Sequence, residues 1–167
     1  AAPTPEATLE RAWIASCARR ERDPFDLDPR VEELFIGPMD RQLRTRSPTL
    51  KMALLLLADR YPAARRLDAL HAECAARLAE YGFDVEERAW LASALARLHQ
   101  ELQVELRLAD PPLRCALGDR PQASALTRSE ARHRYALTTP LHTMLPLEPI
   151  DRAIVEPLDG RRTRDEI

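Results

Sequence analysis

Apolar residues recur every three or four positions in three consecutive stretches between residues 47 and 102, the spacing of a buried helix face. The three sets are Leu50, Leu54, Leu57 and Tyr61; Leu67, Leu70, Cys74, Leu78 and Tyr81; and Leu91, Leu95, Leu98 and Leu102. Val104, Leu106 and Leu108 then alternate with polar residues, which predicts a half-buried strand over residues 103–108. Three helices followed by a strand are the order of a winged helix-turn-helix core, in which Leu54, Leu70 and Leu95 should be fully buried.

Local signals mark the ends of these helices. Ser47 is well suited to cap the first helix, because its hydroxyl can accept a hydrogen bond from a free backbone N–H. Gly82 followed by Phe83 predicts a Schellman-type ending of the second helix. Asp84, with Glu87 three residues later, predicts a capping box that begins the third helix.

The flanking segments carry weaker signals. Residues 1–22 are expected to hold a helix with Thr4 as N-cap, and residues 31–36 fit either a short helix or an edge strand. Residues 137–145 favour an extended conformation and are expected to pair with the strand at 103–108. A short helix is expected from Pro149 to about Leu158, and Thr163 with Glu166 forms another capping box.

These elements predict a mainly α fold with a small β component: a winged helix-turn-helix core with an N-terminal helical extension. We expect three parts along the chain. Residues 1–46 form an N-terminal helical segment and linker, residues 47–145 the winged-helix domain, and residues 146–167 a C-terminal helical segment that is cut short.

Composition adds few constraints on function. The chain has 167 residues, 45% of them apolar, and a net charge of −2, which gives no general attraction to nucleic acid or anionic lipid. No apolar run approaches the roughly 20 residues that span a membrane, and no signal peptide is visible. The three cysteines are far apart, which favours reduced thiols and predicts a cytoplasmic location. Lys51 is the only lysine.

His71 and Cys74 have the spacing of half a metal site on one helix. A zinc site needs four ligands, and the other candidates are scattered along the chain: Cys17, Cys115, His99, His133 and His142. The same scatter argues against a Cys–His nucleophile pair. We therefore expect Cys74 in the core and His71 partly exposed, and assign no catalytic or metal-binding residue.

Arginines supply the candidate surface for a partner. The residues considered for partner binding are Arg41, Arg44, Arg46, Arg65, Arg66, Arg88 and Arg97. The third predicted helix could serve as a DNA-recognition helix, but Asp84, Glu86 and Glu87 lie at the end that would face phosphates and would repel them. A second basic cluster, at residues 128–134, is expected to be an ordinary solvated surface.

The last third of the chain resembles a known family. The residues that carry the resemblance are Arg120-Pro121, Ser124-Ala-Leu-Thr-Arg128, Ala131, His142, Leu147, Arg152 and Leu158-Asp-Gly-Arg-Arg-Thr-Arg164. In this order they are similar to the C-terminal region of bacterial S-adenosylmethionine (SAM)-dependent methyltransferases with a methyltransferase regulatory domain. The rickettsial outer-membrane-protein lysine methyltransferases belong to that group. The resemblance extends over roughly residues 30–167 and implies a catalytic domain on the N-terminal side of this region.

The family's methyl-donor site is a glycine-rich turn after a strand. The four glycines of this chain, Gly37, Gly82, Gly118 and Gly160, are too far apart to build that turn. The resemblance therefore implies a non-catalytic accessory region that serves regulation, substrate recognition or assembly. SAM is expected only in the catalytic domain of the parent protein, and no cofactor is expected in this fragment.

The expected partners are the protein's own methyltransferase domain or the protein that accepts the methyl group. Nucleic acid and a membrane span are not expected, and a homodimer is left open. Two alternatives also stay open: a DNA-binding winged-helix regulator and a free-standing protein-interaction or dimerisation module.

Overall fold

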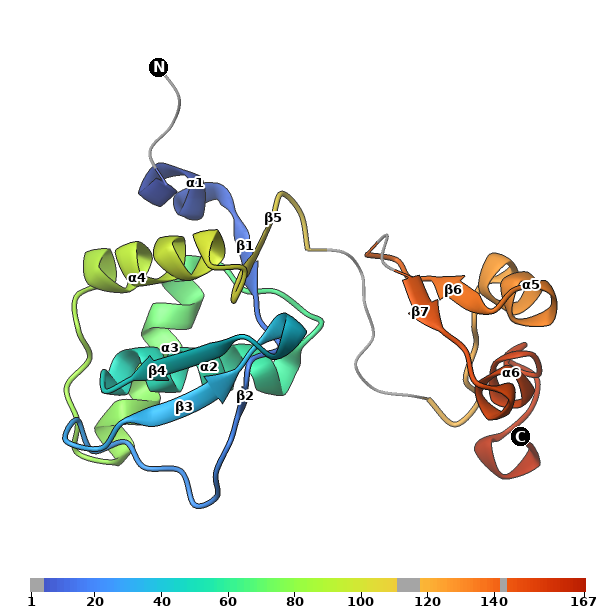
Figure 1. The fold of residues 1–167 in the computed structure, drawn as a ribbon, viewed down its shortest axis with the longest axis horizontal. Helices are drawn as coiled ribbons and strands as arrows, with labels where there is room; N and C mark the ends of the chain where they lie inside the picture. The colour runs from blue at the N-terminus through green and yellow to red at the C-terminus, as the bar shows by residue number, and fades with distance from the viewer. Residues whose placement is uncertain (1–4, 111–117, 142–143) are drawn as a thin grey trace. The chain divides into compact units, whose positions relative to one another are not determined.

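The computed structural model describes residues 5–110, 118–141 and 144–167 (Figure 1). Thr4, Cys115, His142 and Thr143 lie outside the described residues, so the predictions made for them are not addressed. The chain forms two compact units, residues 1–110 and 111–167. The predicted domain over residues 47–145 is therefore not one compact unit, because its first part packs with the N-terminal segment instead.

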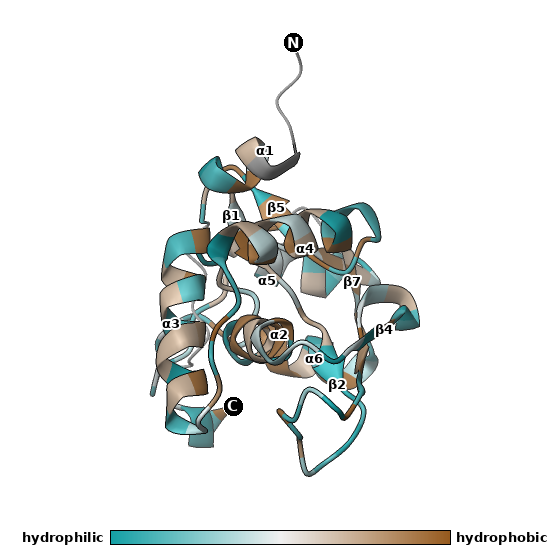
Figure 2. Ribbon diagram, turned by 90° about the vertical axis from the view of Figure 1, so that its left-hand side faces the viewer, coloured by the Kyte–Doolittle hydropathy of each residue, from teal (hydrophilic) through white to brown (hydrophobic). Residues whose placement is uncertain are grey.

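Three helices form the centre of the first unit: α2 (Pro48–Arg60), α3 (Leu67–Glu80) and α4 (Arg88–Gln100). α2 packs against both of the others, and Figure 2 shows apolar colouring along much of it. Leu54, Leu70 and Leu95 are fully buried, as predicted from their spacing. The predicted faces are confirmed within the helices, but Tyr81 and Leu102 are 64% and 52% exposed, because they lie beyond the ends of α3 and α4.

The predicted ends of the first two helices are confirmed. The Ser47 hydroxyl accepts a hydrogen bond from the Leu50 N–H at 3.0 Å, which caps α2. Gly82 has a φ of 76°, and the Phe83 N–H donates to the Leu78 carbonyl at 3.0 Å, as in a Schellman motif.

The predicted start of the third helix is wrong. α4 begins at Arg88, and Asp84 and Glu87 form no capping box. The segment before α4 is bound to the first turn of α2 instead: the Glu86 N–H donates to the buried Thr49 hydroxyl at 2.9 Å, and the Ser47 hydroxyl donates to the Glu86 carboxylate. Tertiary hydrogen bonds replace the local cap here.

The N-terminal helix is also shorter than predicted. α1 (Pro5–Arg11) packs against α4 and is followed by β1 (Trp13–Ala15), not by further helix. Ile14 and Arg65 exchange two backbone hydrogen bonds, of 2.7 and 2.8 Å, which hold residue 14 in an extended conformation. β1 pairs antiparallel with β5 (Glu105–Arg107), so the partner predicted for that strand, residues 137–145, is wrong.

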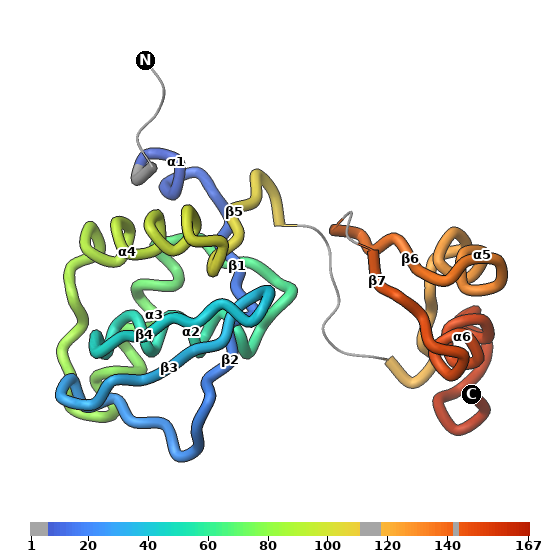
Figure 3. The backbone as a smooth tube through the Cα atoms, in the orientation of Figure 1, coloured from blue at the N-terminus to red at the C-terminus, as the bar shows by residue number. Residues whose placement is uncertain are grey.

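A three-stranded antiparallel meander completes the first unit (Figure 3). It consists of β2 (Arg19–Arg20), β3 (Glu33–Ile36) and β4 (Gln42–Thr45), with a short 3₁₀ turn, η1 (Pro38–Asp40), between the last two. Of the two alternatives for residues 31–36, the strand is therefore correct, but β3 lies in the middle of the sheet and not at its edge.

Lys51 lies below the loop that joins β2 to β3. Its ammonium is fully buried and donates to the carbonyl oxygens of Asp26, Asp28 and Val31 at 2.9, 2.9 and 2.8 Å. Three backbone acceptors satisfy the three donors of an ammonium group. The only lysine of the chain thus fixes residues 26–31 over α2.

The second unit contains α5 (Ala125–His133), β6 (Ala136–Thr138), β7 (Met144–Pro146), α6 (Pro149–Val155) and η2 (Arg164–Glu166). β6 and β7 pair with each other as an antiparallel hairpin. The helix predicted from Pro149 ends at Val155, earlier than expected, and the Thr163–Glu166 capping box is confirmed. Over the described residues the fold is mainly α with a small β component, as predicted.

Candidate functional site

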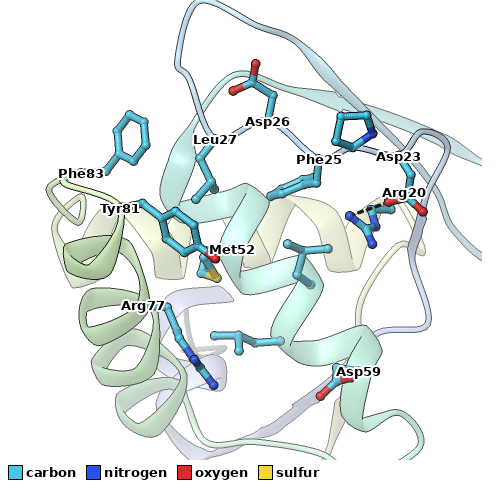
Figure 4. A pocket seen from close by; sticks show the side chains of 13 residues that line it. Arg20, Asp23, Phe25, Asp26, Leu27, Met52, Asp59, Arg77, Tyr81 and Phe83 are labelled. Atoms are coloured by element: carbon cyan, nitrogen blue, oxygen red, sulfur yellow. Dashed lines mark ion pairs between the residues drawn. The ribbon is translucent and has the colours of Figure 1, made fainter.

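An apolar groove of about 790 Å³ lies in the first unit. Loop residues Phe25 and Leu27 form one wall, and Met52, Leu55 and Leu56 of α2 form its floor. The remaining apolar lining lies at the end of α3, with Tyr81 and Phe83. Figure 4 shows this lining running from Phe83 at one end to Arg20 and Asp23 at the other. We call this feature the apolar groove.

Charged side chains frame the apolar groove. Arg20 forms an ion pair with Asp23 at 2.8 Å, and its guanidinium lies 5.7 Å from the centre of the Phe25 ring. Arg77 of α3 pairs with Glu80 at 3.5 Å, and Asp59 lies at the end of α2. These charges are exposed and mixed in sign, so the groove is suited to bind apolar side chains flanked by polar groups.

The groove is built by the loop that Lys51 holds. The Lys51 ammonium donates to carbonyl oxygens of this loop and so fixes residues 26–31. Phe25 packs edge-on against the buried Phe35, with 6.2 Å between the ring centres. Burial lowers the pKa of Lys51, although the carboxylates of Glu33, Asp26 and Asp28 oppose that shift. The wall of the groove therefore depends on one buried cation.

This groove was not predicted from the sequence, although the leucine pattern of α2 indicates it. Residues 54–57 are four consecutive leucines, and one face of a helix cannot bury all four. Leu54 and Leu57 point into the core, whereas Leu55 and Leu56 are only half-buried and line the groove. The loop wall could not be predicted, because Phe25 and Leu27 lie more than twenty residues away in a segment without periodicity.

Three of the predicted partner-binding arginines are engaged within the first unit. Arg88 binds Glu10 at 2.5 and 2.7 Å and Asp68 at 2.5 Å. Arg66 donates to the backbone carbonyls of Glu10 and Arg11, both at 2.7 Å, and so caps the end of α1. Arg65 is nearly buried and pairs with Glu73. These residues tie α1, α3 and α4 together.

The other four lie elsewhere on the first unit. Arg44 of β4 and Arg46, just after that strand, both face Glu32 at 3.6 Å. Arg97 lies 4.0 Å from the Glu101 carboxylate, and Arg41 donates to the Glu101 carbonyl at 3.4 Å. Each of the seven predicted arginines thus has an acidic or carbonyl partner close by.

The His71–Cys74 pair has a structural environment. Cys74 is fully buried, and burial raises the pKa of its thiol to about 12. The His71 ring contacts the Glu86 carbonyl at 2.9 Å. Among the described residues, no group of three or more His, Cys, Asp or Glu side chains could hold a metal ion.

No helix in the described part of the chain is long and apolar enough to cross a membrane.

Comparison with known proteins identifies the second unit. The family profile described as "PKMT, C-terminal winged helix domain" matches residues 119–167. The matched residues begin after the strand at 105–107, whereas the winged-helix domain was predicted to start at residue 47. The order of three helices and a strand suggested the earlier position, but it does not distinguish a winged helix from other helical packings.

Solved structures match nearly the whole chain. PKMT2 from Rickettsia typhi superposes with a TM-score of 0.74 at 20% identity, over 95% of this chain and 34% of that one. The same protein in complex with AdoHcy gives a TM-score of 0.77 at 18% identity, over 95% and 32%. This chain spans about a third of the length of those proteins. No curated protein sequence matches. The predicted resemblance is therefore confirmed: residues 119–167 match the PKMT C-terminal winged helix domain, and the chain shares the fold of a segment of PKMT2.

Proposed function

We propose that this chain is a non-catalytic accessory region of a SAM-dependent protein methyltransferase, and that it binds protein through the apolar groove. The match of residues 119–167 to the PKMT winged helix domain carries the first half of the proposal. This chain shares the fold of a segment of PKMT2, and one structure of PKMT2 is a complex with AdoHcy. The methyl donor would bind in the catalytic domain of the parent protein.

The geometry of the groove supports protein binding rather than chemistry. Its walls and floor are aliphatic and aromatic, and the charged groups at its rim include two ion-paired arginines. Apolar hollows with a polar rim are typical of sites that receive side chains from a partner protein. The occupant would be a segment of the methyltransferase domain or of the methyl-acceptor protein.

The DNA-binding alternative receives no support from the arginines of α4. Arg88 is committed to two carboxylates, and Arg97 faces Glu101. The segment that leads into α4 carries Glu86 and Glu87, whose charges would repel phosphates. We therefore expect no sequence-selective DNA binding at physiological salt.

The proposal is tested in the complete polypeptide that carries this chain. Leu56→Asp places a charge in the groove, and Leu126→Asp is the matched control on an exposed helical leucine of the second unit. We expect Leu56→Asp to lower kcat/KM for the protein acceptor by about ten-fold or more, the effect of losing about 1.4 kcal/mol of binding. Binding of S-adenosylhomocysteine should stay unchanged, and Leu126→Asp should behave like the wild type.

Two results would count against the proposal. Equal acceptor kinetics for both variants and the wild type would show that the groove does not bind the acceptor or orient the catalytic domain. Full methyl transfer by a polypeptide that lacks residues 1–167 would remove the accessory role altogether.

A further inference from the structure

The floor of the apolar groove follows one stripe of α2. Met52, Leu55, Leu56 and Asp59 line it, and they are related by steps of three and four residues. Residues at this spacing form the ridges of a helix surface, between which the side chains of a second helix pack. From Met52 to Asp59 the stripe rises by about 10 Å, or about two helical turns. The floor therefore has the pattern and the length of a helix–helix contact.

The two walls also favour a helix over an extended segment. One wall is the loop with Phe25 and Leu27, and the other is the end of α3 with Tyr81 and the Phe83 that follows it (Figure 4). Of the described residues that line the groove, only Arg20 belongs to a strand, so there is little backbone with which an extended segment could pair. A helix bonds its own backbone groups and presents only side chains to the groove.

The charges at the rim are balanced except for one. Four of the five charged lining residues have an opposite charge beside them: Arg20 with Asp23, Arg77 with Glu80, and Asp26 with the buried Lys51. The Asp59 side chain is exposed and forms no ion pair within 4.0 Å among the described residues. The C-terminal end of α2 adds partial negative charge close to it. One negative charge at the end of the floor is thus uncompensated.

We propose that the apolar groove binds an amphipathic helix of a partner protein, with apolar side chains on its inner face and a lysine or arginine that pairs with Asp59. The inference rests on the function proposed above and adds the kind of segment that enters the groove. The apolar side chains would pack on Leu55, Leu56 and Tyr81. A long basic side chain fits the end of the floor, because its methylene groups cover apolar surface while its charge stays in water.

Methyl NMR of the 167-residue chain, labelled at its three methionines, tests the proposal. Met52 lies on the floor of the groove, whereas Met39 and Met144 lie outside it, are 73% and 70% exposed, and serve as internal controls. The probe is a hydrocarbon-stapled helical peptide of about 16 residues, with leucines at i, i+3, i+4 and i+7 and lysines beside that stripe. We expect a saturable shift of the Met52 methyl group alone, with a Kd of about 100 μM.

Matched peptides and variants isolate the charge. Glutamines in place of the lysines should weaken binding about three-fold, and glutamates about ten-fold, because one exposed ion pair contributes modestly. Asp59→Asn should weaken the lysine peptide about three-fold and leave the glutamine peptide unchanged. Glu101→Gln removes an exposed carboxylate just after α4 that does not line the groove, and should change neither affinity.

A further peptide isolates the helical conformation. It has the same leucines and lysines but no staple, and a proline at its centre prevents a continuous helix. We expect it to bind at least about ten-fold more weakly than the stapled lysine peptide, because its leucines cannot form one stripe.

Three outcomes would overturn the proposal: equal affinities across the charge series, equal binding of the proline peptide, and a Met52 shift that is absent or shared by Met39 and Met144. None of them decides the proposed function, which is judged by the acceptor kinetics of Leu56→Asp in the complete polypeptide. Normal kinetics of Leu56→Asp beside the expected peptide results would reject that function and keep the helix-binding site.

Discussion

The two units of this chain are stabilised in different ways. In the first, one continuous apolar cluster joins residues from α1, β1, β3, β4 and all three central helices. Among the described residues of the second, the buried apolar cluster consists of Ala131, Leu137 and Leu147, with Val155 packed against it. The hydrophobic contribution to stability must therefore be much smaller in the second unit, because it scales with the apolar area removed from water.

Polar contacts also stabilise the second unit. The nearly buried Glu130 carboxylate accepts hydrogen bonds from the N–H and the hydroxyl of Thr138, at 2.9 and 3.1 Å, and so joins α5 to β6. Ser124 caps α5, and capping boxes begin α6 and η2. Met144, Leu145 and Ile150 remain more than half exposed. A small domain with so little core is expected to be only marginally stable.

The largest loss of stability is expected from a change in the core of the first unit. Leu70→Ala removes a fully buried side chain between α3 and its neighbours and should lower the free energy of unfolding of the first unit by about 2–5 kcal/mol. The matched change in the second unit, Leu137→Ala, should leave the transition of the first unit unmoved. Chemical denaturation followed by hydrogen exchange, which reports each unit separately, measures both. A Leu70→Ala protein with an unchanged midpoint would show that the core of the first unit is misassigned.

The next prediction concerns the buried cation under the groove. Lys51→Met leaves three backbone carbonyls without their donor, which should lower the free energy of unfolding by about 3 kcal/mol. The protein no longer buries a charge, and this gain offsets part of that loss. The backbone N–H groups of residues 26–28, 30 and 31 should exchange faster than in the wild type. Unchanged exchange in that loop would mean that Lys51 does not hold the wall of the apolar groove.

The contrast between the two units was only partly predictable from sequence. Helical spacing located Leu54, Leu70 and Leu95 in the core, because packing against a helix face imposes that spacing. Features that depend on tertiary contacts were predicted wrongly. The cap expected at Asp84 does not form, and the segment before α4 is bound to the Thr49 hydroxyl instead. Residues 13–15 form a strand because β5 and Arg65 pair with them. The apolar groove combines segments that no local pattern links.

A pH dependence specific to the first unit follows from Cys74. The folded state holds the thiol proton up to a pKa of about 12, whereas an unfolded chain releases it near 9. Between these values the unfolded state binds fewer protons, so stability falls as pH rises, by up to about 1.4 kcal/mol per pH unit. Cys74→Ala should make this slope shallower, and the remaining slope comes from groups such as Cys17 and Tyr61, whose pKa values burial also raises. Urea titrations between about pH 9 and 11 compare the two proteins, and equal slopes would contradict the assignment.

The smallest effect tests the polar support of the second unit. Glu130→Gln keeps the shape of the side chain but replaces a charged acceptor, and should cost the second unit about 1 kcal/mol. Arg134→Gln, which changes a neighbouring charge without a described side-chain contact, is the control. Equal loss of amide protection at Thr138 in both variants would argue against the proposed role of the carboxylate.

The central claim, that this chain is accessory and not catalytic, is tested most directly by calorimetry. S-adenosylhomocysteine is titrated into the 167-residue chain at concentrations up to about 1 mM, where an interaction of about −4 kcal/mol would register. We predict no saturable heat, since the scattered glycines cannot form the turn that cradles an adenosyl cofactor. A saturable heat with one-to-one stoichiometry would contradict the accessory role and place a cofactor site within these residues.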